Sequence, residues 1–240
     1  MIVIKGIGWI TLTRYGSIIR KLQGNYNDLK SLHSHLQHES VLKYAIKNFG
    51  RFDIASKMTC CSIALALNDA GITYSEHMKH DIGILGTNNA GCLESNLSYF
   101  KDYVSSGRTI ARGNFFIYTL PSTPMAEAAI HFGCQGPLLY IKFQHNQIPS
   151  MLRYVGKMIL CGETSKMIAV EANEEKAVCF VLGNKDNTST MKSLSLEEVV
   201  DIIEKISDFD EMIIRNVDEL TSSSRRTDLG RICSILNHKS

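Results

Sequence analysis

The stretch from Cys134 to Gly162 constrains the fold of this chain more than any other. It opens with Gly136-Pro137, followed by a short aromatic and β-branched segment, residues 138–143, which predicts a buried strand. Apolar residues then recur at spacings of four, three and four, as on one face of an α-helix that ends at Gly162: Ile148, Leu152, Val155 and Ile159. The polar residues 144–146 therefore lie at a strand-to-helix corner, where a helix N-terminus can stabilise the negative charge that develops on a nucleophile.

Composition indicates an ordinary globular protein. The 240 residues are 44% hydrophobic and 21% charged, enough for one sizeable α/β domain or two small ones. A net charge of +2 without a basic run among aromatic residues gives no indication of nucleic-acid binding. No run approaches the ~18 apolar residues of a membrane span, and residues 1–5 are too short for a signal peptide. We therefore predict a cytoplasmic protein without membrane insertion.

Three features could suggest a bound ion or cofactor, and each has a simpler interpretation. The seven cysteines include no Cys-x-x-Cys pair and are interpreted as small buried residues in a reducing compartment. Histidines 33, 35 and 38 invite a metal site, but positions two apart do not share a helix face, and a solvated surface is favoured. Gly6-Ile7-Gly8 ends a strand without a helix signature after it, which disfavours nucleotide binding. We predict no metal and no cofactor.

The other segments alternate between strand and helix patterns. Strands are predicted at 2–10, from 81, at 166–170 and at 176–182, and helices at 54–69, 97–104 and 122–132, the first capped by Asp53. Residues 112–121 are predicted to form an extended aromatic loop. A capping box of Ser195 and Glu198 begins a last helix, and a strand is expected at 212–217. We expect one domain over 1–221 and a polar tail over 222–240.

The Gly-Pro strand, the polar corner and the helix ending in glycine resemble the β-ketoacyl-acyl carrier protein synthase family, whose fold is thiolase-like. In that family the catalytic cysteine stands eight positions after the proline and seventeen before the glycine. Counting forward from Pro137 and back from Gly162 leads to His145 both times. The first strand with its Gly-x-Gly, the Asp-Ala-Gly helix end at 69–71, Gly86-Thr87 and the paired late strands also resemble the family. The resemblance covers residues 1–183.

The resemblance implies a fold class and a departure from the family's chemistry. We expect an α/β, thiolase-like, single N-terminal-half αβα domain with a mixed five-stranded sheet, extended by a C-terminal helix and strand. A synthase continues with a second half that carries two histidines, one of them in a His-Gly-Thr-Gly-Thr turn. None of the eight histidines here stands in such a turn. The resemblance therefore predicts no acyl thioester at His145 and no condensation by this chain alone.

Apolar surface on the helix after the corner points to a covering element. Met151, Met158 and Leu160 add to the predicted buried stripe, so that one sheet does not cover all apolar positions. Each side chain left in water would forgo ~2 kcal/mol. We expect the last helix and strand, or a partner, to cover this helix.

Within the family, the resemblance is to chain length factors: synthase-like subunits without the cysteine, which dimerise with an active ketosynthase and wall part of its acyl tunnel. Short forms are associated with aryl-polyene and flexirubin-type pathways. It implies an active ketosynthase as partner, with acyl carrier protein meeting the complex. The implied tunnel residues are Phe115, Phe116, Tyr118, Gln144 and His145, and the implied partner interface is Leu138, Leu139, Tyr140, Ile141, Lys142 and Phe143.

Three alternatives remain open from the residues. The aromatic residues 115, 116 and 118 could be ordinary core side chains, since buried aromatics usually pack. His145 could serve a stand-alone enzyme that acts on acyl thioesters, because a helix N-terminus favours a neutral imidazole. The chain could also be a homodimeric scaffold that binds acyl chains or acyl carrier protein.

Overall fold

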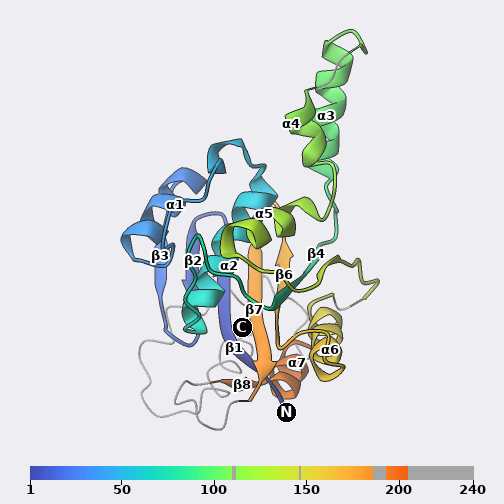
Figure 1. Cartoon of the computed structure of the whole chain (residues 1–240). Helices are drawn as coiled ribbons and strands as arrows, with labels where there is room; N and C mark the ends of the chain where they lie inside the picture. The colour runs from blue at the N-terminus through green and yellow to red at the C-terminus, as the bar shows by residue number, and fades with distance from the viewer. Residues whose placement is uncertain (110–111, 146, 186–192, 205–240) are drawn as a thin grey trace, which may run out of the picture.

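A mixed β-sheet forms the centre of the molecule (Figure 1). The computed structural model describes residues 1–109, 112–145, 147–185 and 193–204. The strand order is β3-β2-β1-β7-β6-β4-β5, and β8 pairs with β1. The strands are β1 (Ile2–Ile10), β2 (Arg14–Ser17), β3 (Gln23–Asn25), β4 (Ile82–Thr87), β5 (Leu138–Tyr140), β6 (Lys166–Ala172), β7 (Ala177–Asn184) and β8 (Leu194–Ser195).

Five of these strands form the predicted mixed sheet. Strand β4 runs parallel to both β5 and β6, whereas β7 is antiparallel to its neighbours β6 and β1. The β2–β3 hairpin and β8 extend the sheet beyond β1, pairing with opposite ends of that strand. The fold class expected from the resemblance is therefore confirmed, with a sheet that is wider than five strands.

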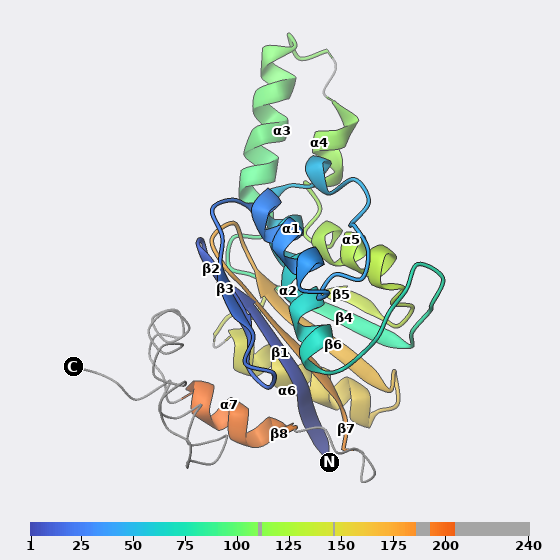
Figure 2. The same ribbon diagram turned by 90° about the vertical axis from the view of Figure 1, so that its left-hand side faces the viewer.

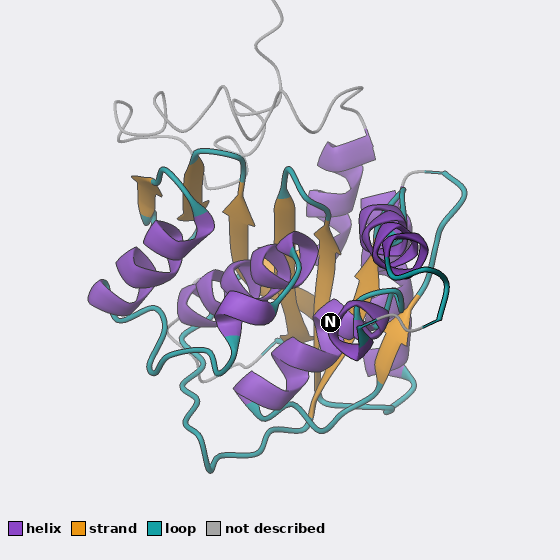
Figure 3. Cartoon of the chain, turned by 90° about the horizontal axis from the view of Figure 1, so that it is seen from above, coloured by secondary structure: helices purple, strands orange, loops and turns teal. Residues whose placement is uncertain are grey.

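Helices cover both faces of the sheet, as Figures 2 and 3 show. One core lies between the sheet and α1, α2 and α5, and a second core lies between the sheet and α6 and α7. Helices α3 and α4 stand apart from both layers. The helices are α1 (Leu29–His38), α2 (Ile54–Asp69), α3 (Leu93–Ser105), α4 (Gly113–Ile117), α5 (Thr123–Phe132), α6 (Gln147–Leu160) and α7 (Leu196–Glu204).

Helix α2 lies directly against β1, and two glycines make this possible. A Cβ atom at Gly6 would lie 2.4 Å from the carbonyl oxygen of Ala66, and one at Gly8 would lie 2.5 Å from that of Ser62. No side chain fits at these distances, so the Gly-x-Gly pattern serves close backbone packing. Close packing of α2 on β1 therefore explains the two glycines without a phosphate-binding role.

A buried carboxylate at the end of α2 fixes the strand and loop beside it. Asp69 is fully buried and accepts three backbone hydrogen bonds: from Ile7 N at 2.8 Å, Ile19 N at 3.1 Å and Arg20 N at 2.7 Å. The bond to Ile7 falls just after the irregularity in β1 between Ile4 and Gly6. Asp69 thus supplies the acceptor for one backbone amide of β1 and for two amides of the loop that follows β2.

Helix α7 covers much of the apolar surface of α6. The predicted stripe of α6 is buried, Met151 is fully buried beside it, and Met158 packs against the same core. Five buried side chains of α7 join this core: Leu196, Val199, Val200, Ile202 and Ile203. Arg153 and Glu204 form a bidentate ion pair across the two helices, at 2.5 and 2.9 Å. Leu160 stays exposed.

Two local predictions are wrong, and some fall outside the described residues. Residues 112–121 are not extended: they contain α4, whose Phe116 ring packs on Tyr99 of α3. Residues 138–143 form a strand only as far as Tyr140, and β5 is half-buried because it is the last strand of the sheet with β4 as its neighbour. The predicted strand at 212–217 and the boundary at 221/222 lie outside the described residues. Among those described, no helix is long and apolar enough to cross a membrane.

Removing the Asp69 carboxylate tests its role. Asp69→Ala leaves three backbone donors without an acceptor, and we expect the free energy of unfolding to fall by about 3 kcal/mol in urea titrations. Asp69→Asn keeps one acceptor oxygen in the same place and should lose less. An Asp69→Ala protein within about 0.5 kcal/mol of the wild type would contradict this account.

Candidate functional site

The carboxyl ends of β4, β5 and β6 meet at one edge of the sheet, where ligands bind in many open α/β folds. Asn88, directly after β4, ties these ends together. Its Nδ2 donates to the carbonyl oxygens of Gly91 at 3.0 Å and Ala172 at 3.1 Å. The hydroxyl of Tyr140, the last residue of β5, donates to Asn88 Oδ1 at 3.2 Å. One buried amide thus sets the relative positions of all three strand ends.

The first residue of α6 reaches the same edge. Gln147 Oε1 accepts a hydrogen bond from Thr87 Oγ1 at 2.9 Å, and Gln147 Nε2 donates to Asn89 Oδ1. Helix α6 is therefore connected to the strand ends through Gln147. Neither Asn88 nor Gln147 stands out as a site residue in the sequence, where the polar pair directly after β4 is the only signal for this contact.

His145 lies outside this network. Its side chain is exposed, and its backbone carbonyl accepts a hydrogen bond from Ser150 Oγ at 3.1 Å. Figure 1 shows the β5–α6 connection swinging outward from the sheet before α6 begins. Gln144 is exposed on the same connection, whereas Phe143 is half-buried, with its ring 6.3 Å from that of Tyr154. The predicted corner is thus an outward loop.

A pocket of about 740 Å³ opens beside the strand ends. The residues that line it come from the start of α2, the turn after β4, α3, α4 and the β6–β7 turn. Two predicted tunnel residues, Phe115 and Tyr118, are among them. Carboxylates of Asp53, Glu94, Glu174 and Glu175 and the guanidinium of Arg51 supply its charged groups, so the pocket combines an aromatic wall with a largely acidic rim.

Asp53 holds two helices at the pocket. One carboxylate oxygen accepts from Ser56 N at 2.8 Å and caps α2, as predicted, and the other accepts from Ser95 Oγ of α3 at 2.7 Å. Ser95 is buried. This carboxylate therefore fixes the base of α3 against the N-terminus of α2.

Tyr118 forms the buried part of the aromatic wall. Burial, together with the nearby carboxylates of Glu127 and Asp53, raises the pKa of Tyr118 to about 12. Burial also raises the pKa of Glu127, and a hydrogen bond from Tyr118 opposes that shift. The phenol stays protonated at neutral pH and acts there as a hydrogen-bond donor.

The other aromatic residues of α4 have different surroundings. The Arg112 guanidinium lies 4.5 Å from the centre of the Phe115 ring and pairs with Asp102 at 2.6 Å. Phe116 is exposed, and its ring centre is 5.7 Å from that of Tyr99. The structure thus places Phe115 and Tyr118 at the pocket, while Phe116, Gln144 and His145 are not among its lining residues.

The described residues contain no group of three or more His, Cys, Asp or Glu that could hold a metal ion. Of the three clustered histidines, His33 accepts a hydrogen bond on Nε2 from Ile46 N at 3.2 Å and stacks on Phe49 at 4.4 Å. Burial lowers the pKa of His33, which keeps it neutral and suited to this structural contact.

Comparison with known proteins gives the fold its name. No family model and no curated protein matches the sequence. Several solved structures resemble the structure of this chain. One is the ishigamide ketosynthase/chain length factor, with 12% identity and a TM-score of 0.53, where 79% of this chain and 63% of that chain are covered. A β-ketoacyl synthase from Burkholderia phymatum STM815 has 16% identity, a TM-score of 0.55, and coverage of 77% and 59%.

A third similar structure is a ketosynthase (ApeO) in complex with its chain length factor (ApeC) from Xenorhabdus doucetiae, with 13% identity, a TM-score of 0.52, and coverage of 78% of this chain and 81% of that chain. At these identities the comparisons show a shared fold, that of thiolase-like ketosynthases and chain length factors. The chain spans about three fifths of the length of the first two proteins.

The shared Asp53 contact predicts how α3 is held. Asp53→Ala removes both bonds, and we expect a loss of about 1 kcal/mol in the free energy of unfolding and faster amide hydrogen exchange in the first turns of α2 and α3. Ser95→Ala removes only the bond to α3, so exchange should rise in α3 alone. Equal exchange in α3 for both variants and the wild type would contradict a tethering role.

Proposed function

We propose that this chain is a non-catalytic ketosynthase-like subunit, a chain length factor, which pairs with an active β-ketoacyl synthase and shapes its acyl tunnel. The observation that carries the proposal is His145: in a chain with the ketosynthase fold, an imidazole stands where the resemblance places the nucleophilic thiol. The fold itself rests on the similar structures. The assignment of a role within that fold is our inference.

The surroundings of His145 support an inactive position. Covalent catalysis needs a nucleophile activated by a base, and a condensation also needs donors that stabilise the enolate. His145 is exposed on a loop, and within the described residues no carboxylate is hydrogen-bonded to its ring. A base without an orienting partner is a weak catalyst.

The edge of β5 supports a heterodimer. This strand is last in the sheet order, so one side of its backbone has no strand neighbour within the described residues. Unpaired strand edges favour pairing with another chain. The resemblance implies antiparallel pairing with the matching strand of a partner, through the half-buried or exposed residues Leu138, Leu139, Tyr140, Ile141, Lys142 and Phe143.

The similar structures agree with such an assembly. The Xenorhabdus doucetiae structure is a ketosynthase in complex with its chain length factor, and this chain covers 81% of the chain it matches there. We propose a cytoplasmic heterodimer of this kind, which meets acyl carrier protein as a complex. It would act in polyene or polyketide synthesis of the aryl-polyene type, or in fatty-acid-type synthesis.

A proline at one position of β5 tests the interface. Pro137 O accepts from Ile84 N, and Ile141 N donates to Gly86 O, so in the parallel ladder the amide of residue 138 points to the open side. Leu138→Pro removes this amide, whereas Leu138→Ala removes only side-chain atoms. On co-expression with the ketosynthase of the same gene neighbourhood, we expect gel filtration to show a complex with Leu138→Ala and a loss of it with Leu138→Pro.

Other outcomes distinguish the alternatives. Two separate peaks for the wild-type pair would contradict the heterodimer. A stable homodimer with no affinity for any ketosynthase would favour a scaffold. Turnover of acyl thioesters by the isolated chain, lost in His145→Ala, would show an enzyme.

The pocket gives a second test. If Phe115 limits the space for an acyl chain, Phe115→Ala in the complex should shift products by about two to four carbons toward longer chains, since a lost ring frees volume for a few methylenes. Phe116→Ala is the matched control, because that ring packs on Tyr99 outside the pocket. Mass spectrometry of carrier-bound products measures the shift. Identical product lengths for both variants would contradict a tunnel role for this wall.

A further inference from the structure

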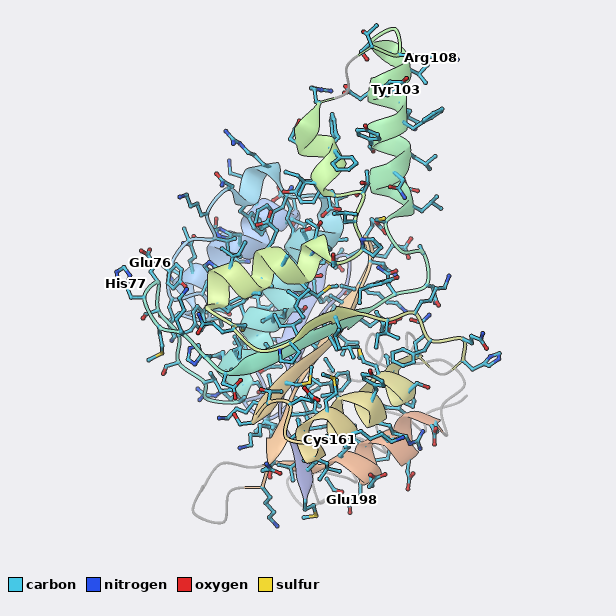
Figure 4. The ribbon with its side chains drawn as sticks, turned by 45° about the vertical axis from the view of Figure 1, so that its right-hand side comes forward. Glu76, His77, Tyr103, Arg108, Cys161 and Glu198 are labelled. Carbon is cyan, nitrogen blue, oxygen red and sulfur yellow. The ribbon has the colours of Figure 1, made fainter. Side chains whose placement is uncertain are left out.

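Helices α3 and α4 form an arm that rises away from the sheet and its layers, with Tyr103 and Arg108 near its tip (Figures 1 and 4). Among the described residues, the contacts that tie α3 to other elements come from one face of the helix. Ser95 binds Asp53, Tyr99 packs on Phe116, and Asp102 pairs with Arg112. The positions 95, 99 and 102 follow each other at helical spacings of four and three, as expected for one face.

The opposite face of α3 is apolar and exposed. Leu93, Leu97, Phe100 and Val104, here called the α3 stripe, have exposed fractions of 53%, 41%, 61% and 41%. Their spacing of four, three and four places them within about 60° of one another around the helix, at ~100° per residue. An amphipathic helix normally turns such a stripe to its own core. This one points away from the molecule, which marks a contact surface for another molecule.

The side chains that flank the stripe identify the occupant. Glu94 and Lys101 border one side, and Asn96 and Tyr103 border the other. In an antiparallel pair of helices related by a two-fold axis, each flank meets the same flank of its partner. Centring the pair between residues 98 and 99 sets Leu97 against Phe100, Leu93 against Val104, and Glu94 beside Lys101 of the other copy. A parallel pair would instead place Glu94 and Lys101 beside the uncharged flank.

We propose that the α3 stripe binds the α3 stripe of a second copy of this chain, as an antiparallel two-fold helix pair. The apolar seam fits its own copy in this arrangement, and the flanking charges of Glu94 and Lys101 are self-complementary here but not in a parallel pair. The seam is short, below the area of a typical stable interface, so the pair is weak, with a Kd on the order of 10 µM. This contact goes beyond the proposed function, because it uses a different element from β5 and would join two copies whether or not each holds a ketosynthase.

Charge exchange on the flank is the decisive test, since it leaves the apolar seam and the fold unchanged. Lys101→Glu places Glu94 beside a second carboxylate twice per dimer, and we expect sedimentation equilibrium over a micromolar concentration series to give a Kd about fivefold weaker. The double variant Glu94→Lys/Lys101→Glu restores both pairs and should return the wild-type Kd. Lys47→Glu makes the same charge change at an exposed site on another part of the chain and should leave Kd unaltered.

Variants of the seam and of β5 complete the experiment. Leu97→Asp or Phe100→Asp, with unchanged circular dichroism spectra, should weaken the pair roughly 100-fold. Leu138→Pro should leave self-association intact while ketosynthase binding is lost, so that failure of one proposal is separate from failure of the other. A chain that stays monomeric throughout, a dimer that survives the Asp variants, a charge exchange that does not restore Kd, or self-association abolished by Leu138→Pro would overturn the proposal.

Discussion

The close contact between α2 and β1 is the interaction on which the rest of the structure depends. Without side chains at Gly6 and Gly8, the helix backbone rests on the strand itself, and α2 is buried along most of its length. Such an approach gains dispersion contacts along two regular elements and leaves no space for repacking. The position of α2 is therefore set within narrow limits. The elements that are hydrogen-bonded to its two ends are held in fixed positions through it.

An aspartate at each end of α2 joins the helix to other elements by hydrogen bonds. At the C-terminal end, Asp69 fixes β1 and the loop that joins β2 to β3. At the N-terminal end, Asp53 caps the helix and holds Ser95 at the base of α3. The position of the pocket wall and the base of the α3–α4 arm thus depend on the packing of α2, whose core residues share a cluster with Tyr118 of the wall.

The sequence predicted the regular elements best where one period dominates. The helical stripe of α6 comes from burial of one helix face against the sheet, which leaves a local pattern in the sequence. The segment 112–121 is predicted from the sequence as an extended aromatic loop, yet residues 113–117 are helical and pack on α3 through Phe116 and Tyr99. The edge position of β5 depends on the order of the strands in the sheet, which cannot be predicted from a short stretch of sequence.

The candidate site shows the same limit. Asp53 was recognised as a cap because capping is local, but its bond to Ser95 joins residues 42 positions apart. Gln147 and Thr87 are separated by 60 positions, and no local sequence pattern at either residue predicts their hydrogen bond. Phe115 and Tyr118 could be selected as aromatic candidates from the sequence, whereas only the fold separates them from Phe116, which faces α3.

The two helical layers of the described residues differ in how completely their apolar side chains are covered. In the described residues, α7 closes the core over α6, with Leu196 packed so closely on Gly156 that a Cβ there would lie 2.7 Å from its methyl group. Much of the apolar surface of α6 is therefore covered by α7. Apolar residues remain exposed on α3 and α4, and also on other elements, as Ile130 of α5 at 77% and Leu160 of α6 at 69% show. Of these exposed side chains, those of α3 and α4 lie on the two helices that also supply lining residues of the pocket.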